Sequence, residues 1–398
     1  MRFLHTSDWH LGKPLTTQTA AYSRLEEQRA FIDELERICD AKAADFIIIA
    51  GDIYDGPNPP VAAEKLFYDA LKRLSAGGRR PVIVISGNHD NPDKLTVARP
   101  FTDGHGIALF GSPKNACVEL DINGERAVVA ALPFVSETRL NELLFDLSGS
   151  ETDMRRGYSD KIKELFEIAA ERFGGDTVNI AAAHFYITGS RTSESEDNLK
   201  IGGVYAVDAA SLPRKAQYIA MGHLHRAQKC AGSDTAHYCG APFCFQKDEA
   251  GARKYVYAVD VHPGKPAEVE RVPLTDYKPI YRLEAWSFEE AEALCAPRAG
   301  ENCWLYLTLF TDDVLAAARA DELRRTYKNL VEIEILPPGE AAALENMLNE
   351  RDADDAFSIR QAFCEFYRQA NKTKAEPDDE LLNMFMDLCE VADETDNA

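Results

Sequence analysis

The chain has 398 residues, and its 66 Asp and Glu against 44 Lys and Arg give a net charge of −22. This acidity argues against a protein that coats nucleic acid or a membrane through general positive charge, so any polyanion must be bound locally. With 45% hydrophobic residues the chain can bury a sizeable core, and its length predicts two or three domains.

Sequence features at the level of the whole chain point to a cytoplasmic protein. The N-terminus reaches Asp8 before any apolar run long enough for a signal peptide, and no stretch of about 18 apolar residues follows. The nine cysteines are scattered and include no C-x-x-C pair, which argues against a disulfide framework or a zinc knuckle. We expect reduced thiols, no secretion and no membrane span.

Residues 1–277 alternate helical patterns with short apolar runs. The stretches 21–43 and 62–76 repeat apolar residues at helical spacing, which predicts two amphipathic helices. The short runs are apolar on both faces, as is typical of buried strands: 46–50, 81–86, 128–132, 179–183 and 218–221. This order predicts a layered α/β domain.

Polar clusters follow the predicted strands. They are Asp8-Trp-His10, Gly51-Asp52-Ile-Tyr-Asp55, Gly87-Asn88-His89-Asp90, His184 and Gly222-His223-Leu-His225. Loops beyond the carboxyl ends of strands in an open α/β sheet converge on one crevice, so residues far apart in sequence can meet there. The glycines before the polar residues are consistent with turns that need a positive φ or a close backbone approach.

The side chains of these clusters suit a pair of divalent metal ions. Carboxylate and amide oxygens suit Mg or Mn, and imidazole suits Mn, Fe or Zn. A mixed N/O set without thiolate favours Mn or Fe over a structural zinc. The spacings Asp8-x-His10 and His223-x-His225 let alternate residues reach one ion from opposite sides.

Each motif alone also has a structural interpretation. A single His such as His184 after an apolar strand is more often a hydrogen-bonded core residue, and Gly-Asp and Gly-Asn are ordinary turn dipeptides. Five motifs in this order, each at a strand end, favour the metal site. Four further histidines lie outside these motifs, and we expect surface or packing roles for them: His5, His105, His237 and His262.

The motifs D-x-H, G-D-x-x-D, G-N-H-D, a single His and G-H-x-H, in this order, resemble those of the calcineurin-like metallophosphoesterases. Longer matches look like the SbcD branch, the nuclease subunits of SbcCD double-strand-break complexes: TSDWHLG at 6–12, GDIYDGP at 51–57, ISGNHDN at 85–91, IGG at 201–203 and MGHLHR at 221–226. The resemblance covers about the first 280 residues. It implies a four-layer β-sandwich flanked by helices, with a small α+β capping domain and a C-terminal helical tail.

The resemblance also implies roles for the site residues. Two divalent ions, Mn²⁺ with Mg²⁺ or Fe²⁺ as alternatives, would share Asp52. One would bind Asp8, His10, Asp52 and His225, and the other Asp52, Asn88, His184 and His223. His89 would donate to the phosphate or to the leaving 3′-oxygen, and Asp55 would orient that imidazole by accepting its other N–H.

Candidate DNA contacts come from basic residues near these motifs. The polar segment 189–200 lies between two of them, and the family uses this segment near its substrate. Arg and Lys at phosphates position a nucleic acid without reading its bases. The candidates are Lys13, Arg191, Lys200, Arg226 and Lys229, although a solvated surface position is at least as good an interpretation of each one.

Residues 278–340 have the order β-α-β-α-β. The pattern predicts strands at 280–286, 304–310 and 331–335, and helices at 287–294 and 314–327. Candidate boundaries lie near 276–279 and at Pro337-Pro338-Gly339. This order fits the capping domain of the family, which leans over the nuclease cleft.

Residues 341–398 form an acidic tail, with 15 acidic against 5 basic residues. Apolar residues at helical spacing predict amphipathic helices at 358–369 and 378–393. In the family this segment binds the SMC-like ATPase SbcC. Packing on the chain's own domains is the alternative.

The helices 61–76 and 93–101 carry apolar faces. In the family the corresponding helices form a two-fold dimer, which would make Leu66, Phe67, Ala70 and Leu71 intermolecular contacts. The alternative is packing on the parent sheet.

These patterns together predict a Mn-dependent DNA nuclease subunit. The expected activities are a 3′→5′ exonuclease on duplex ends and a single-strand or hairpin endonuclease. One alternative is a dinuclear phosphoesterase acting on a small phosphodiester such as a cyclic nucleotide. The other is a non-enzymatic adaptor, which is disfavoured because every metal-ligand position is present.

Overall fold

The computed structural model describes residues 1–17, 20–114, 116–136, 151–192, 206–313, 316–340 and 367. The chain divides into two compact units, residues 1–308 with 317–334 and residues 309–316 with 335–398. Within the described ranges no helix is both long and apolar enough to span a membrane.

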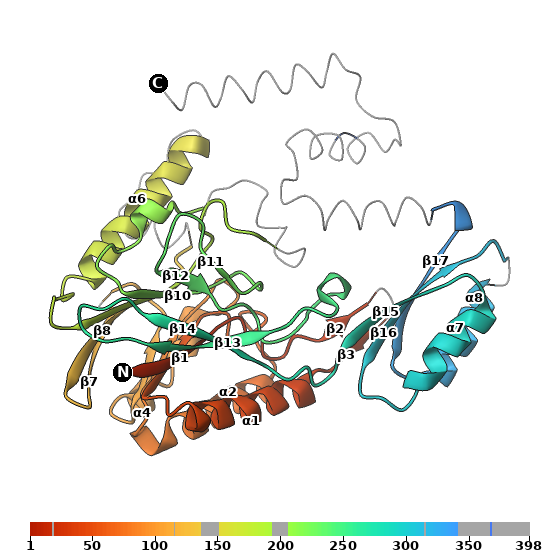
Figure 1. Ribbon diagram of the computed structural model, residues 1–398, viewed down its shortest axis with the longest axis horizontal. Helices are drawn as coiled ribbons and strands as arrows, with labels where there is room; N and C mark the ends of the chain where they lie inside the picture. Colours follow the sequence, from red (N-terminus) through yellow and green to blue (C-terminus); the bar gives the residue numbers. More distant parts are fainter. Residues whose placement is uncertain are drawn as a thin grey trace, which may run out of the picture. The chain divides into compact units, whose positions relative to one another are not determined.

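The first unit contains two six-stranded sheets (Figure 1). The first has the order β14-β13-β1-β4-β5-β6, and β1, β4, β5 and β6 run parallel. Its strands are β1 Arg2–Thr6, β4 Phe46–Ala50, β5 Val82–Ile85, β6 Ile107–Phe110, β13 Tyr255–Asp260 and β14 Glu268–Pro273. The parallel strands therefore end at one edge of the sheet, where the loops after β1, β4 and β5 begin.

The second sheet has the order β11-β12-β10-β9-β8-β7, with β8, β9, β10 and β12 parallel. Its strands are β7 Cys117–Ile122, β8 Glu125–Leu132, β9 Val178–His184, β10 Tyr218–Gly222, β11 Gln228–Lys229 and β12 Ala236–Tyr238. His184 is the last residue of β9 and lies opposite Gly222 of β10.

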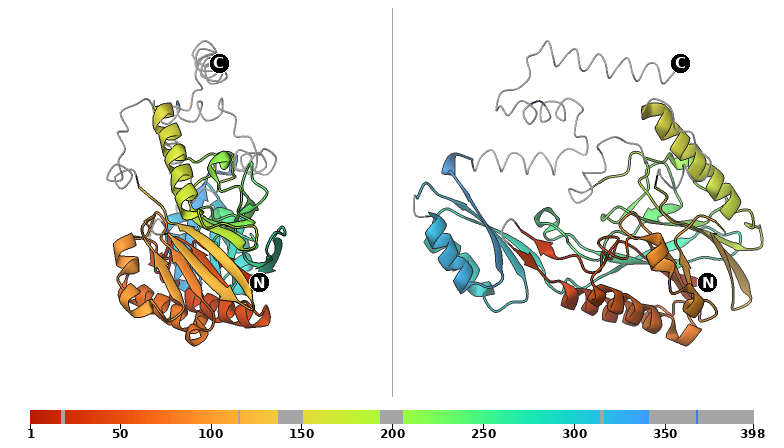
Figure 2. Two further views of the ribbon diagram at one scale, coloured as in Figure 1. Left: turned by 90° about the vertical axis from the view of Figure 1, so that its left-hand side faces the viewer. Right: turned by 180° about the vertical axis from the view of Figure 1, so that it is seen from behind.

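Helices cover the outer faces of the two sheets, which makes four layers (Figure 2). Alternate residues explain the layering: Ile48 of β4 lies in the core between the sheets, whereas Ile47 and Ile49 lie in the core beneath α1 and α2. A third core joins the second sheet to α6. The helices are α1 Leu25–Ala41, α2 Val61–Leu74, α3 Pro92–Thr96, α4 Arg99–Thr102 and α6 Glu151–Ala169. The predicted four-layer α/β fold is confirmed.

Residues 280–336 form the predicted β-α-β-α-β order. The strands β15 Ile280–Ala285, β16 Trp304–Phe310 and β17 Leu330–Leu336 make a three-stranded sheet in chain order. The helices are α7 Phe288–Cys295, which Ser287 caps by accepting from the Glu290 N–H, and α8 Ala316–Thr326. Most of these residues belong to the first compact unit, so the predicted boundaries of a separate capping domain stay a prediction.

Two shorter features complete the described fold. Residues predicted to begin the first helix instead form β3 Ala21–Tyr22, which pairs with β2 Leu15–Thr16, so α1 begins at Leu25. Short 3-10 helices lie at Ala76–Gly78, Ala209–Ser211, Lys247–Glu249, Ala296–Arg298 and Pro338–Glu340. The helices predicted at 358–369 and 378–393 lie outside the described residues, except for Tyr367.

Four residues of α2 that the resemblance would make contacts with a second copy instead pack on the chain's own sheet, which is the alternative interpretation. Leu66, Phe67, Ala70 and Leu71 are at most 6% exposed, because they form the inward face of α2 and pack on the first sheet. The apolar residues that remain exposed nearby are Val61, Tyr68, Val97 and Phe101.

Candidate metal centre

The five polar clusters meet where the parallel strands of both sheets end. The Asp8 loop follows β1, the Asp52 loop follows β4, and Asn88 and His89 follow β5. Two hydrogen bonds join the sheets here. The main-chain N–H of His223 donates to Asp8 Oδ1 at 2.9 Å, and His184 Nδ1 lies 2.8 Å from the Ala50 carbonyl oxygen. The predicted convergence of distant residues is therefore present in the fold.

One group of ligand atoms gathers around His10. Its Nε2 lies 3.1 Å from Nε2 of His225, and a carboxylate oxygen of Asp8 completes a group whose atoms lie within 4.8 Å of one another. All three residues are at most 5% exposed. Two imidazole nitrogens and a carboxylate facing one another in a buried space fit a divalent cation.

A second group gathers around Asn88. Its Oδ1 lies 2.8 Å from His223 Nδ1 and 3.0 Å from His184 Nε2. Asp52 lies between the two groups, with Oδ2 3.3 Å from His184 Nε2 and 3.6 Å from His10 Nε2. This carboxylate is therefore placed where a ligand shared by two ions would lie.

Backbone strain accompanies the ligand residues. Asp8, His10, Asp52 and His223 have positive φ angles of 55°, 43°, 49° and 102°. Such conformations are unfavourable for residues with a Cβ, and they persist where the surrounding structure fixes them, often at functional sites. The strain is evidence for a built site that is independent of the ligand chemistry.

Three glycines allow the loops to approach closely. A Cβ on Gly87 would collide with Asp52 Oδ1, and one on Gly222 would collide with the Ala50 carbonyl oxygen. Gly51 has a positive φ of 89°, and a Cβ there would also collide with the His184 ring. The sequence prediction that these glycines serve turns or close approaches is confirmed.

Asp90 holds two of the loops together, a role that sequence reasoning did not assign. Its buried carboxylate accepts the N–H groups of Gly87, Ile53 and Tyr54 at 2.9 to 3.1 Å. Burial and then the neighbouring Asp52 raise the pKa of Asp90 to about 6. Its place in the G-N-H-D motif was the signal available, because a carboxylate after a sharp turn can satisfy free main-chain donors.

Neighbouring charges within the site change one another's pKa values. Burial opposes ionisation of Asp52, but His184 and His10 hold the pKa of this carboxyl well below its ordinary value. Burial alone would lower the pKa of His184, yet Asp52 and Asp8 raise it to about 9. Burial lowers the pKa of His223 to about 3, so this imidazole is neutral and can coordinate a metal.

His89 lies beside the ligand groups without joining the Asn88 group. Its main-chain N–H donates to Asp52 Oδ1 at 2.9 Å, and its ring Nδ1 lies 3.0 Å from the main-chain carbonyl of Asp55. The expected contact with the Asp55 carboxylate is wrong, because that carboxylate lies 2.7 Å from Lys13 Nζ and 3.6 Å from His10 Nδ1. A carbonyl can only accept, so Nδ1 carries the proton of this hydrogen bond and Nε2 is the nitrogen that faces other partners.

The candidate DNA contacts have varied surroundings. Lys13 is paired with Asp55, Lys229 with Asp234 at 3.4 Å, and Arg191 bonds Gln228 through its main chain. Arg226 is exposed immediately after the His225 loop. Lys200 lies outside the described residues.

Comparisons with known proteins decide the family. The calcineurin-like phosphoesterase family matches residues 1–227. The chain belongs to this family. The SbcD subunits of the nuclease SbcCD are 39% identical in Bacillus subtilis (100% of both chains), 31% in Rhodobacter capsulatus (78% of this chain, 81% of the relative) and 30% in Escherichia coli K12 (79% of each). The resemblance found from the five motifs is confirmed, and within the phosphoesterase family it points to the SbcD branch.

Proposed function

We propose that the chain is the metal-dependent nuclease subunit of an SbcCD-type complex that cleaves DNA together with an SMC-like ATPase, SbcC. The observation that carries this proposal is the 39% identity, over its full length, to the SbcD subunit of a nuclease SbcCD. The buried group of histidines and carboxylates at the strand ends supplies the matching chemistry.

The proposed ligands divide between two positions. Asp8, His10 and His225 would hold one divalent cation, Asn88, His184 and His223 the other, and Asp52 both. When bound, the ions would polarise a phosphodiester and lower the pKa of a water into the range of a usable nucleophile. Mn²⁺ is the cation we propose, since the donors are nitrogen and oxygen without thiolate.

His89 would act on the substrate through Nε2. The Asp55 carbonyl holds Nδ1, and the Asp52 carboxylate holds the His89 main chain, so the ring has a fixed direction. From this position a protonated His89 would donate to a phosphate oxygen or to the leaving 3′-oxygen. Asp55 would act as a positioning residue through its carbonyl.

The finer activities proposed are 3′→5′ exonuclease cleavage of duplex ends and endonuclease cleavage of single strands and hairpins. The test is Mn²⁺-dependent digestion of duplex DNA labelled at one end, with a cyclic-nucleotide ester as the competing substrate class. Shortening of the labelled strand from its 3′ end would support the proposal. Hydrolysis of the ester alone would support the small-phosphodiester alternative.

Residues 278–340 are proposed as a capping domain, and residues 341–398 as the segment that binds the ATPase. The order β15-α7-β16-α8-β17 supports the first assignment, and the acidic amphipathic pattern of the tail supports the second. Removal of residues 341–398 should abolish co-purification with SbcC and leave Mn²⁺-dependent cleavage intact. Retained co-purification would contradict the tail assignment.

Replacement of Arg226 by alanine should weaken DNA binding severalfold at low salt. It should also reduce the slope of log affinity against log salt concentration by about one, the share of a single phosphate contact. The reason is that Arg226 is an exposed cation directly after the His225 loop. Fluorescence anisotropy across a salt series measures the effect. Arg214→Ala, an exposed arginine at the opposite end of β10, is the control, and an equal loss in both variants would contradict a local contact.

A homodimer through α2, α3 and α4 is proposed from the exposed apolar residues there. Phe101 is 81% exposed, Val97 66% and Val61 64%, and Lys94 on α3 pairs with Glu64 on α2 at 3.1 Å. Phe101→Glu should raise the dimer dissociation constant at least about tenfold, since it places a charge in an apolar contact. Sedimentation velocity measures it, with Ile168→Glu, a residue 62% exposed on α6, as the control. A monomeric wild type at micromolar concentration would contradict the dimer.

Metal binding should release protons at pH 7.5. Asp52 and Asp8 raise the pKa of His184 to about 9, so this ligand holds a proton that the metal must displace. Affinity for Mn²⁺ should therefore rise as the pH increases toward about 9. Titration calorimetry in two buffers of different ionisation enthalpy measures the protons released, and equal apparent enthalpies would contradict the prediction.

A further inference from the structure

Phe245 is a buried aromatic residue against the metal centre. It lies in the loop between β12 and β13 and is 6% exposed. Its ring meets the His10 ring at 5.2 Å and 81°, and the His225 ring at 5.2 Å and 62°. One side chain therefore touches both imidazoles that face each other across the first ligand group.

The two ligand groups are oriented by different means. His184 in the second group is fixed by its Nδ1, 2.8 Å from the Ala50 carbonyl. His10 lacks such a bond, because its Nδ1 has no hydrogen-bond partner among the described residues and the closest carboxylate oxygen, of Asp55, is 3.6 Å away. Metal-bound imidazoles are usually directed by a hydrogen bond from the second nitrogen. Ring packing, beside the distant Asp55 carboxylate, therefore contributes to the direction of His10.

A buried ion pair fixes the loop that carries Phe245. Glu249, 8% exposed, accepts the Phe245 N–H at 2.7 Å and pairs with Lys254 Nζ at 2.5 Å. The same Nζ lies 3.5 Å from the carbonyl of His225. The Glu249–Lys254 pair thus holds the main chain of Phe245 and reaches that of His225.

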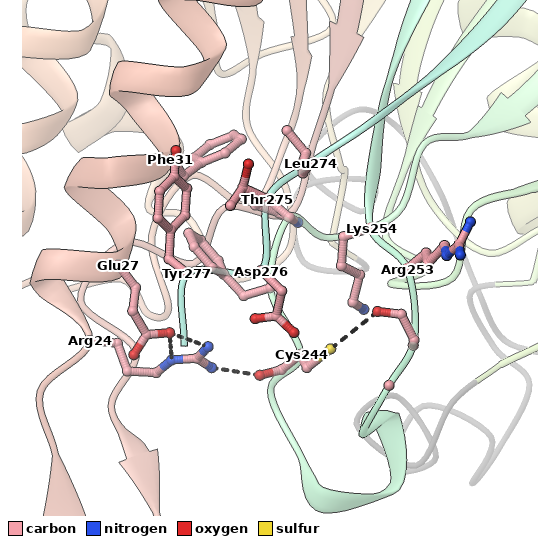
Figure 3. Close-up of a pocket in the computed structure, with 14 residues that line it drawn as sticks. Arg24, Glu27, Phe31, Cys244, Arg253, Lys254, Leu274, Thr275, Asp276 and Tyr277 are labelled. Carbon is pink, nitrogen blue, oxygen red and sulfur yellow. Dashed lines mark hydrogen bonds and ion pairs between the residues drawn. The ribbon is translucent and has the colours of Figure 1, made fainter. Parts of the chain in front are cut away.

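Arg24 fixes the loop from the opposite side. Its buried guanidinium is paired with Glu27 and donates to the Cys244 carbonyl at 2.7 Å, as Figure 3 shows. It also lies over the Phe243 and Phe245 rings, 5.5 and 5.7 Å from their centres. A cavity of about 180 Å³ beside these residues leaves the loop without solid packing there. Polar contacts from Arg24 and Glu249 therefore add to the core packing that holds Phe245.

We propose that Phe245 is a positioning residue for one of the two metal positions, that of Asp8, His10 and His225. By packing on both imidazole rings it keeps their Nε2 atoms directed at one point. The Asn88, His184 and His223 position does not depend on it, because His184 is held by the Ala50 carbonyl. This inference rests on the proposed dinuclear site.

The test is Mn²⁺ binding by Phe245→Leu in the full-length chain, measured by calorimetry and by electron paramagnetic resonance. Wild type should bind two ions and give a spin-coupled signal. The variant should bind one ion with unchanged affinity and the second at least about tenfold more weakly, the range for loss of groups that orient ligands. Its spectrum at intermediate Mn²⁺ should be the six-line signal of isolated ions.

Matched variants separate positioning from loss of structure. Phe245→Tyr keeps the ring and should restore the second ion. Glu249→Gln leaves the Phe245 side chain unchanged but removes the charged carboxylate that accepts the Phe245 N–H and pairs with Lys254, so it should weaken the same position. Lys247→Ala, on the same loop but paired with Glu332 and Glu334, should bind two ions normally. Thermal melting in EDTA verifies that each variant is folded.

Two results would overturn the proposal: wild-type affinities at both positions in folded Phe245→Leu and Glu249→Gln chains, or an equal loss at both positions. A wild-type chain that binds no Mn²⁺ would instead overturn the proposed function. The two failures are therefore distinguishable.

Discussion

Replacement of His89 by glutamine should lower DNA cleavage by about 10² to 10⁴-fold, the usual contribution of a general acid or base. Glutamine has a similar reach and can still donate a hydrogen bond, but it cannot transfer a proton at neutral pH. Because no ligand position is altered, both Mn²⁺ ions should remain bound. Single-turnover digestion of labelled duplex DNA measures the rate, and calorimetry measures the metal.

The control for His89→Gln is His105→Gln, which changes a histidine outside the metal site. It should cleave at the wild-type rate. A His89→Gln chain that keeps its cleavage rate would remove His89 from the reaction. A chain that loses metal together with activity would make His89 a ligand, which its 4.8 Å grouping with His10 and Asp52 also allows geometrically.

The metal centre was predictable because its ligand residues follow the apolar runs of the strands directly in the sequence. A buried strand has a recognisable apolar run, and a parallel sheet places all the residues that follow such runs at one edge. The sequence patterns therefore predicted that five residues far apart in the chain lie close together, although a sequence contains no distances. They are Asp8, Asp52, Asn88, His184 and His223. The glycines beside them were predictable for the same reason, since a close approach between loops leaves no room for a Cβ.

Other features depend on atoms that a sequence does not place. The apolar pattern of α2 shows that one face is buried, but it does not distinguish the chain's own sheet from a second copy, and Leu66 and Phe67 pack on the sheet. Asp55 contacts His89 through its carbonyl, because its carboxylate is paired with Lys13. Phe245 sits in an irregular loop, where an aromatic residue has no periodicity to reveal its neighbours.

The acidity of the chain also has a structural interpretation. Asp8 and Asp52 are buried carboxylates whose charges two dications would offset, and the tail 341–398 carries −10 of the total of −22. Residues 1–277 still have a net charge of −7. Unaided DNA binding is therefore expected to be weak and to fall as salt increases.

Replacement of Asp52 by asparagine should weaken both metal positions, each by about 100-fold or more, since a neutral amide replaces the charged carboxylate that both positions share. One of its oxygens lies 3.3 Å from His184 and 3.6 Å from His10, so its charge serves both groups. Loss of that charge should also lower the pKa of His184 from about 9, because Asp52 is the first group that raises it. Calorimetry measures the ions, and the imidazole NMR titration measures the pKa.

His225→Asn is the matched comparison, because His225 belongs to the first group alone. It should lose one ion and retain the other, with the pKa of His184 still raised by Asp52. An Asp52→Asn chain that behaves in the same way, with one position at wild-type affinity, would contradict a shared carboxylate. The two variants together thus distinguish a bridging ligand from one that belongs to a single ion. We expect a bridging ligand because Asp52 lies between two separate groups of side chains.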